Sequence, residues 1–410
     1  MNLAIIGAGA SGLVAAIEAS KRGLHVSVFE KNAKLGRKIL ATGNGRCNIT
    51  NQNISAEHYH SQQPRFINAT LSRFGSAKCV SYFRELGLEV REGEKGRLYP
   101  MNHQSSSVVD MLVHECRQRG VSFFVESEVV LLEKTGDKFG LHVKDATHLF
   151  DACLIATGGL AMPTLGSSES GYVFAQKMGH TLIEPYPSLV QVVCEEKSVQ
   201  ALSGVKVEGE IAVIIEGEKK RTAFGDILFT NYGVSGSAVL DVSRDIAQAL
   251  SLKRSVNVIL DVMPQFSKEH LETLLQKRLQ FAVDKSLALW LEGIINKKLA
   301  PFIIQQASLP KTILNASMLG IKEIKKLAYA LKHISLHVND TKGFGSAEVT
   351  AGGVDVREIN PESFESKIVK NLYFSGEVLD VDGDCGGYNL HFAWASGFVA
   401  GNAVGKHLSH

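Results

Sequence analysis

Three glycines near the N-terminus have the spacing of a phosphate-binding turn. They form a Gly-x-Gly-x-x-Gly pattern between a short apolar run, residues 3–6, and a segment with helical periodicity. In such a turn the first glycine permits a tight bend, the second lets the backbone approach a pyrophosphate, and the third lets the helix pack closely on the strand. The amides at the helix N-terminus then point at the phosphates. The expected contacts in this turn are Gly7, Gly9, Ala10, Ser11 and Gly12.

An acidic residue follows at the distance that a dinucleotide site requires. Residues 25–29 read as a second strand, and Glu30 comes directly after it. A carboxylate at this position would hydrogen-bond a ribose 2′-hydroxyl and would disfavour a 2′-phosphate. Lys31 is a further candidate contact. A glycine-rich turn without a ligand is the alternative, but the strand, turn, helix and second strand together favour dinucleotide binding.

The segment after the acid indicates which dinucleotide is bound. Residues 31–51 lack the second helix that a plain NAD-binding domain would begin, and they combine cations with a Gly-x-Gly turn and three asparagines. Cations suit a pyrophosphate, and constrained backbone with polar groups suits a ring system. A basic surface loop is the alternative. The candidate contacts are Arg37, Lys38, Thr42, Gly43, Asn44, Gly45, Arg46, Cys47 and Asn48.

A returning strand supports a flavin dinucleotide. Residues 128–151 read as a β-meander with turns at 136–137 and 145–146, and a buried strand follows at 152–156. A strand that closes on a Thr-Gly pair under the cofactor is typical of two-part flavin domains. The candidate contacts here are Val129, Ala156, Thr157, Gly158 and Gly159.

Near the C-terminus, Asp380, Asp382 and Asp384 have the spacing of a calcium loop. An EF-hand loop counted from Asp380 needs glycine at its sixth position and glutamate at its twelfth. Those positions hold Cys385 and His391, so we predict no metal site. We interpret the segment as a second clamp on the flavin. Its candidate contacts are Gly376, Glu377, Asp384, Gly387, Tyr388 and Asn389.

A helix that begins near residues 388–389 would suit the flavin's chemistry. Two-electron reduction places negative charge near N1 and C2=O of the ring, and a helix N-terminus with the Asn389 amide would stabilise that charge. A plain helix start after a glycine turn is the alternative. We name no catalytic acid or base, because the flavin itself carries the electron chemistry.

Several stretches together resemble the HI0933-like (YhiN/BaiN-like) flavoproteins, a branch of the glutathione-reductase-like FAD fold. They read IIGAGASGLVAAI, GRKILATGNGRCNITN, GRLYP, ATGG, LFTNYGVSGSAVLDVS, AEVTAGGV and GEVLDVDGDCGGYNLHFAWASG, and they run from residue 4 to residue 397. The resemblance implies bound FAD and an FAD-dependent oxidoreductase acting on a small organic molecule. Some members are linked to aminoacetone oxidation or bile-acid reduction, and most have no established substrate.

The expected architecture is an α/β Rossmann-like FAD domain, with a parallel sheet and a β-meander, interrupted by an insert. The FAD domain would comprise residues 1–188 and 338–410. The insert would be a β-sheet or barrel over 189–265 and helical over 266–337. We expect it to cover the substrate side of the flavin, with residues 228–236 forming either a loop over the ring or an ordinary hairpin.

The electron donor is less defined than the cofactor. No second Gly-x-Gly-x-x-Gly lies between a strand and a helix. NAD(P)H is therefore expected to dock transiently, or the substrate or another carrier reduces the flavin. Cys47 has no partner at CxxC spacing, so a small buried residue is favoured over a reactive thiol. His391 reads as a packed or solvent-facing histidine, and Tyr99 is the first residue to test for substrate contact.

Charge gives limited information about partners. The net charge is +2, but residues 251–335 hold 13 Lys/Arg against 6 Asp/Glu. Solvated helix faces are the favoured interpretation, and the Lys/Arg pairs lack the interleaved aromatics of a base-stacking surface. We therefore rank a nucleic-acid-modifying flavoprotein below a small-molecule enzyme. A flavin-binding sensor or assembly protein without turnover is the third hypothesis.

Cysteine usage and hydropathy bear on the compartment. Six scattered cysteines form no CxxC pair, which favours a reducing environment. The N-terminus enters an apolar run without a charged leader, and no run is long enough to span a bilayer. A cytoplasmic protein is expected, and its oligomeric state is left open.

Overall fold

The computed structural model describes residues 1–310 and 312–408, which fall into two compact units. Unit one comprises Met1–Pro187 and Glu348–His410, and unit two comprises Ser188–Ala347. The chain therefore leaves unit one once and returns to it. The sequence placed the return at residue 338, but that position lies within strand β18 (Ile334–Thr341), whose pairing with β13 and β17 belongs to unit two.

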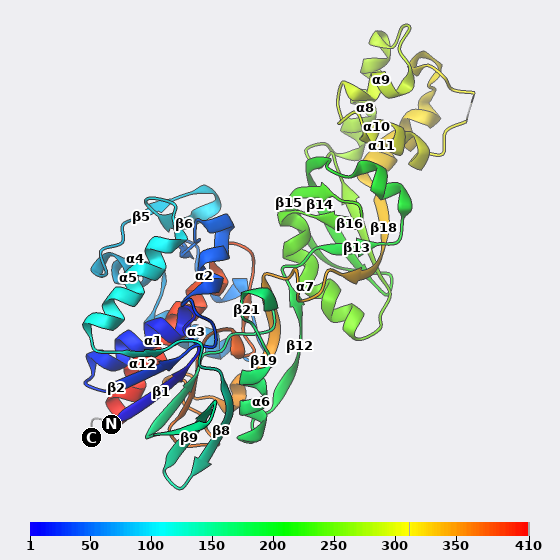
Figure 1. Cartoon of the computed structure of the whole chain (residues 1–410). Helices are drawn as coiled ribbons and strands as arrows, with labels where there is room; N and C mark the ends of the chain where they lie inside the picture. Colours follow the sequence, from blue (N-terminus) through cyan, green and yellow to red (C-terminus); the bar gives the residue numbers. More distant parts are fainter. Residues whose placement is uncertain (311, 409–410) are drawn as a thin grey trace. The chain divides into compact units, whose positions relative to one another are not determined.

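A five-stranded parallel sheet forms the centre of unit one (Figure 1). Its order is β20-β11-β1-β2-β7, and each neighbouring pair is parallel. The strands are β1 (Asn2–Ile6), β2 (His25–Phe29), β7 (Ser122–Phe124), β11 (Ala152–Ile155) and β20 (Leu372–Phe374). Strands β1, β11 and β20 are largely continuous apolar runs because both faces of a parallel sheet are covered. This confirms the Rossmann-like fold.

The first and last helices pack closely on each other. A Cβ placed on Gly397 would lie 2.3 Å from the carbonyl oxygen of Ser11, and one on Gly401 would lie 2.5 Å from that of Ala15. Helix α12 (Tyr388–Leu408) can therefore approach α1 (Ala10–Lys21) only because these positions lack side chains. The chain's C-terminal segment thus supports the helix that follows the phosphate-binding turn.

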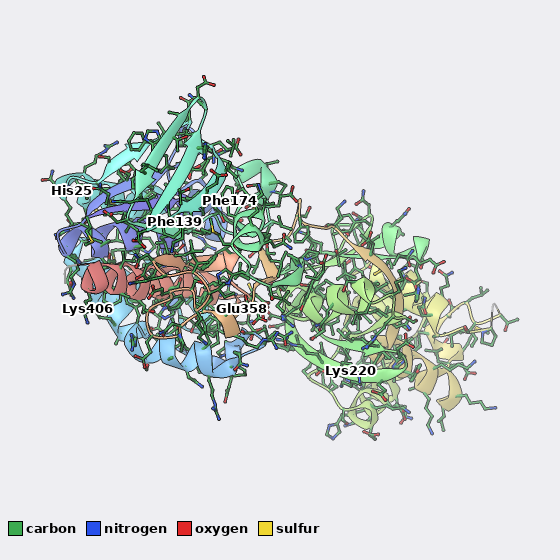
Figure 2. The ribbon with its side chains drawn as sticks, turned by 90° about the horizontal axis from the view of Figure 1, so that it is seen from below. His25, Phe139, Phe174, Lys220, Glu358 and Lys406 are labelled. Atoms are coloured by element: carbon green, nitrogen blue, oxygen red, sulfur yellow. The ribbon has the colours of Figure 1, made fainter. Side chains whose placement is uncertain are left out.

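The other elements of unit one surround this core. The predicted β-meander is present, and its residue Phe139, labelled in Figure 2, is fully buried. The meander strands are β8 (Val129–Thr135), β9 (Lys138–Val143) and β10 (Ala146–Phe150). The short strands are β3 (Thr50–Asn51), β4 (Tyr59–His60), β5 (Val90–Glu92), β6 (Arg97–Pro100), β12 (Leu182–Ser188), β19 (Val349–Val354) and β21 (Asp382–Gly383). The remaining helices are α2 (Arg37–Ala41), α3 (Pro64–Arg73), α4 (Ser76–Glu85), α5 (Ser105–Gln118) and α6 (Ser170–Lys177).

Unit two contains a closed six-stranded barrel of order β13-β16-β15-β14-β17-β18. Besides β18, its strands are β13 (Val192–Cys194), β14 (Lys206–Ile215), β15 (Glu218–Phe229), β16 (Gly233–Ser235) and β17 (Val256–Asp261). Helix α7 (Ser237–Ser251) buries one apolar face in the barrel core. Residues 228–236 form a hairpin in which Phe229 pairs with Val234, so the hairpin alternative describes this segment's local structure.

A helical part is inserted between β17 and β18 of unit two (Figure 1). Its helices are α8 (Lys268–Arg278), α9 (Leu287–Glu292), α10 (Leu299–Gln306) and α11 (Ile321–Lys332). The Lys332 ammonium group ties it to the barrel by donating to Asp261 at 2.6 Å and to the carbonyl oxygen of Phe266 at 2.6 Å. Within the described residues, none of the helices combines the length and apolar character needed to cross a bilayer.

Candidate functional site

Two glycines of the turn after β1 are required by the packing of the surrounding backbone, independently of any ligand. Gly7 has φ +107°, and a Cβ on it would lie 2.4 Å from the carbonyl oxygen of Ala156. A Cβ on Gly12 would lie 2.1 Å from the carbonyl oxygen of Gly7. These positions let β1, α1 and the end of β11 approach one another, as the spacing predicted.

Gly9 differs from the other two because it faces open space. No heavy atom of the described residues lies within 4 Å of a Cβ placed on it. Gly9 is also the N-cap of α1, and no described side chain caps this helix. The first-turn amides of α1 therefore lack a side-chain acceptor, and backbone can approach a ligand here without hindrance. The turn fits the pyrophosphate of a dinucleotide.

Glu30 lies beside this turn at the end of β2. One carboxylate oxygen accepts from the backbone N–H of Ala8 at 3.0 Å. The other accepts from the backbone N–H of Asn32 at 2.9 Å and from its side-chain amide at 2.6 Å. A carboxylate has about four lone-pair sites, so one remains for a ribose hydroxyl. Lys31, the neighbouring candidate, is half-buried. The ribose contact stays a prediction.

The two cations predicted to meet the pyrophosphate contact protein groups. Arg37 donates to the side-chain oxygen of Asn32 at 2.7 Å and to the carbonyl oxygen of Thr164 at 2.9 Å. Lys38 forms an ion pair with Glu377 at 2.7 Å. Arg37 therefore helps to hold the Asn32 amide that reaches Glu30, and Lys38 joins the segment after β2 to the segment after β20.

Thr350 was not identified from the sequence, although it holds two of the predicted segments together. Its hydroxyl accepts from the backbone N–H groups of Leu160 and Ala161 at 2.8 and 2.9 Å, and its own N–H donates to Glu377 at 2.8 Å. A Cβ on Gly159 would lie 2.5 Å from the Thr350 hydroxyl oxygen. The stretch AEVTAGGV pointed to this region but not to the threonine.

Other candidate glycines divide in the same way between packing and open space. Gly376 has φ +77°, and its Cβ would lie 2.6 Å from the Ser11 hydroxyl oxygen at the start of α1. Gly158 has φ +75°, and no described atom lies within 4 Å of its Cβ position. Thr157, just before it, turns its hydroxyl to the Gly158 carbonyl oxygen. The segments after β1, β11 and β20 thus meet at the N-terminus of α1.

The predicted ring-binding turn has an unusual backbone. Gly43, Asn44, Gly45 and Cys47 all have φ between +55° and +81°. The turn is closed by the backbone N–H of Cys47, which donates to the carbonyl oxygen of Thr42 at 3.0 Å. Backbone strain of this kind concentrates at binding sites, and this turn belongs to the stretch that the sequence singled out.

Asn48, at the end of this turn, has an acceptor that the protein does not satisfy. Its side-chain oxygen is buried and has no hydrogen-bond partner among the described residues. A Cβ on Gly387 (φ +99°) would lie 2.8 Å from that oxygen, so the glycine turn before α12 reaches the 42–48 turn. A buried acceptor of this kind needs a donor, and an N–H group of a flavin ring would supply one.

Cys47 is a packed side chain rather than a reactive thiol. It is fully buried, and burial raises the pKa of its thiol to about 12. The neutral thiol therefore dominates at physiological pH, which favours the packing interpretation over the redox one. Arg46 lies over the ring of Tyr99, 5.3 Å from its centroid, and Tyr99 is itself buried beside the turn.

The start of α12 is held by side chains that were predicted to face the flavin. Asn389 accepts from the backbone N–H of Gly383 at 2.8 Å and donates to its carbonyl oxygen at 2.7 Å. Asp384 contacts His60 at 3.0 Å and His58 at 3.2 Å. The Asn389 side chain therefore holds the loop before the helix. Its contact with the flavin, like that of the backbone amides at the helix start, stays a prediction.

Tyr388 and His391 anchor the first turn of α12. Tyr388 is buried, and its ring stacks on His58 with centroids 4.3 Å apart. His391 is fully buried, its Nε2 donates to the carbonyl oxygen of Phe74 at 2.9 Å, and its Nδ1 accepts from the Thr50 hydroxyl at 2.8 Å. Burial lowers the pKa of His391 to about 4, so it is a neutral packed residue.

The aspartate spacing has a structural explanation. Asp380 is buried and accepts from the backbone N–H of Gln62 at 3.1 Å, and Asp382 lies in β21, paired with His60 of β4. In the part of the chain that the structure describes, no group of three or more His, Cys, Asp and Glu side chains could hold a metal ion. Val129, the remaining candidate, is buried at the start of β8.

Comparisons with known proteins were made on this framework. The family model for the HI0933-like protein Rossmann domain matches residues 1–403. The chain belongs to the HI0933-like family. It is 35% identical over 407 residues to a 3-dehydro-bile acid delta(4,6)-reductase of Clostridium scindens, with 99% of each chain covered. It is 34% identical over 408 residues to a ribosomal RNA dihydrouridine synthase of Haemophilus influenzae, with 98% of each covered.

A solved structure agrees with the fold. The 3-ketosteroid delta1-dehydrogenase of Sterolibacterium denitrificans superposes with a TM-score of 0.52 at 13% identity, with 99% of each chain covered. This HI0933-like chain is an FAD-dependent oxidoreductase, as its sequence predicted.

Proposed function

We propose that this HI0933-like protein uses FAD to reduce a carbon–carbon double bond conjugated to a carbonyl group. The observation that carries the proposal is full-length similarity, at nearly equal identity, to relatives whose two names describe one kind of bond change. A 3-oxo steroid with double bonds at positions 4 and 6 is a conjugated enone. The 5,6 double bond of uridine, lost in dihydrouridine, is conjugated to the C4 carbonyl.

The chain's residues would bind and orient the cofactor in unit one. The open side of Gly9 and the α1 amides would hold the pyrophosphate, and Glu30 would hold the ribose. The 42–48 turn, with the unpaired oxygen of Asn48, would hold the ring beside Gly387. FAD, when bound, supplies the two-electron chemistry. The partial positive charge at the N-terminus of α12 would stabilise negative charge at the ring edge.

We further propose that NAD(P)H is a transient electron donor. Gly-x-Gly-x-x-Gly occurs once in a strand–helix context, which supports transient docking instead of a second nucleotide domain. The reaction adds a hydride and a proton across the double bond, so one reduced nicotinamide is consumed for each bond saturated. A small organic enone is the lead substrate class.

Reduction of a uracil base in RNA is the second candidate. It is supported by the dihydrouridine synthase relative and by the excess of positive charge in residues 251–335. Reduction of a small organic enone would not require this positive charge. The small net charge of +2 and the lack of aromatics interleaved with the lysine pairs in the sequence favour the small enone over RNA.

A test would mix the yellow protein with NADH or NADPH without oxygen, and then add a conjugated enone, a saturated ketone of the same skeleton, or uridine-containing RNA. The proposal expects flavin absorbance to return with the enone or the RNA only, together with one equivalent of saturated product. If NADH or NADPH reduces the flavin but none of these compounds reoxidises it, a redox sensor without turnover would be favoured.

A further inference from the structure

The helical part of unit two exposes apolar side chains that its own core does not use. Seven large apolar residues between positions 281 and 329 are more than half exposed. They are Phe281, Val283, Leu289, Leu314, Met318, Ile321 and Tyr329. Single exposed apolar residues are ordinary on a protein surface, so these side chains need a second feature beside them before they indicate a binding site.

The same part carries exposed cations. Among its described residues, the exposed lysines are Lys268, Lys277, Lys297, Lys298, Lys322, Lys325 and Lys326. Two other cations of this part are structural, because Lys332 donates to Asp261 and Arg278 donates to the carbonyl oxygen of Trp290 at 2.8 Å. Two of the exposed lysines also contact backbone, because Lys298 donates to the carbonyl oxygen of Ser203 at 3.1 Å and Lys326 donates to that of Ser308 at 3.5 Å. All seven side chains are nevertheless exposed.

Helix α11 combines both features on one face. Lys325 and Lys326 lie three and four residues after Lys322, and Tyr329 lies four and three residues after them, so the four residues share one side of the helix. We call these four residues the α11 face. All four are exposed, while the opposite side of the helix is buried in the core of unit two. The Tyr329 ring stacks on His333 with centroids 4.7 Å apart, which holds its orientation.

We propose that the α11 face docks RNA. Its three lysines complement phosphates, and its exposed aromatic ring offers a plane on which an unpaired base can stack. The sequence appeared to lack such an aromatic, but the helix brings Tyr329 next to Lys325 and Lys326. The proposal rests on the RNA form of the proposed function, because the docked RNA would carry the base to be reduced.

The structure favours RNA over a lipid surface at this face. An amphipathic helix that lies in a membrane interface inserts its apolar side into the lipid. The apolar side of α11, which includes Ile324, Leu327 and Leu331, is fully buried in the core of unit two. The α11 face presents three cations and one amphipathic ring, and the same helix also has the exposed Ile321 and the half-buried Glu323. Its excess of positive charge suits a polyanion with exposed bases.

The test compares two triple variants of the full FAD-loaded chain. Lys322, Lys325 and Lys326 are changed to Gln in the first variant. In the matched control, three other exposed lysines of unit two are changed to Gln: Lys219 and Lys220 of β15, and Lys253 between α7 and β17 (Lys220 is labelled in Figure 2). Binding of a fluorescent RNA hairpin with a uridine-containing loop is measured against salt. Each lost phosphate contact to single-stranded RNA lowers the salt slope by about 0.7, so the first variant should lose about 2 and the control should match wild type.

A second pair of variants tests the aromatic ring. Tyr329→Ala should weaken binding of the hairpin about tenfold, and Tyr329→Phe should not, because base stacking needs the ring and not the hydroxyl. Equal binding by these two variants would overturn the stacking role. Equal salt slopes in the two triple variants, or binding to phosphatidylglycerol vesicles without binding to RNA, would overturn the proposal as a whole.

The reductase activity is measured separately on a small enone that does not need docking. FAD content and enone reduction should be unchanged in every variant, because the candidate FAD site lies in unit one. If neither wild type nor any variant reduces the enone or the RNA, but the first triple variant loses RNA binding and the control variant does not, the proposed function is wrong and the docking surface is supported. If wild type reduces the enone but binds no RNA at low salt, the docking surface is wrong.

Discussion

Substituting Gly9 by alanine separates cofactor binding from folding. The backbone there has φ −83° and ψ −166°, which alanine adopts freely, and the described residues leave its Cβ position open to 4 Å. Alanine is a poorer N-cap residue than glycine, which destabilises the folded protein, but it also lowers the entropy of the unfolded chain, which stabilises it. Because these effects oppose each other, the free energy of unfolding of the FAD-free protein should change by less than about 1 kcal/mol.

The affinity for FAD should fall much more. A methyl group forced between the turn and a pyrophosphate resembles overpacking, which costs about 1–3 kcal/mol. This corresponds to a dissociation constant roughly 5- to 150-fold higher. The assay removes FAD from both proteins, measures their urea unfolding, and then titrates FAD while following the quenching of its fluorescence.

Gly12→Ala provides the contrast. Its Cβ would lie 2.1 Å from the carbonyl oxygen of Gly7, so this variant should lose stability even without FAD. If the Gly9→Ala protein binds FAD as tightly as wild type, the pyrophosphate does not lie at this turn, and the assignment of the site is refuted.

Three further predictions concern buried positions. The folded pKa of His391 is about 4 against an ordinary value of 6.5, so the unfolded chain takes up the proton first and stability falls as pH drops from 6.5 towards 4. Between pH 7 and pH 5 the free energy of unfolding should therefore fall by about 2 kcal/mol because of His391. In the His391→Gln variant, urea unfolding at these two pH values should no longer show this difference, and an unchanged pH dependence would contradict the prediction. Gly401→Leu should lower the free energy of unfolding by at least about 1–3 kcal/mol, since even its Cβ would lie 2.5 Å from the carbonyl oxygen of Ala15; a wild-type urea midpoint would argue against the close helix contact. Cys47, with a pKa of about 12, should resist iodoacetamide at pH 8 in the native protein and react in urea, as read by peptide mass; native labelling would show that the turn is open.

Much of the fold was predictable because its signals are local. The buried parallel strands β1 and β11 read as continuous apolar runs, and the spacing of Gly7, Gly9 and Gly12 specifies the turn between a strand and a helix. The boundary near residue 338 was not predictable in the same way. Strand β18 belongs to unit two through pairing with β13 and β17, and such long-range pairing leaves no mark within the strand itself.

In the candidate site, too, the features set by local sequence were predictable and those set by long-range contacts were not. The types and spacing of residues 42–48 pointed to a constrained turn, which its left-handed backbone angles bear out. The partners of Asn389 and the role of Thr350 depend on loops that meet only in the folded chain, so no local pattern could assign them. The sequence predicts where a ligand is bound more readily than it predicts which side chains remain available to touch it.

The central claim is that FAD bound in unit one reduces a conjugated double bond. The most direct measurement is an anaerobic reductive titration of the purified protein, followed by addition of a conjugated enone or of uridine-containing RNA. Loss of the flavin absorbance with NAD(P)H, its stoichiometric recovery with one of these acceptors, and an equal amount of saturated product are predicted. A protein that binds no flavin, or whose reduced flavin is reoxidised equally well by a saturated ketone, would contradict the account.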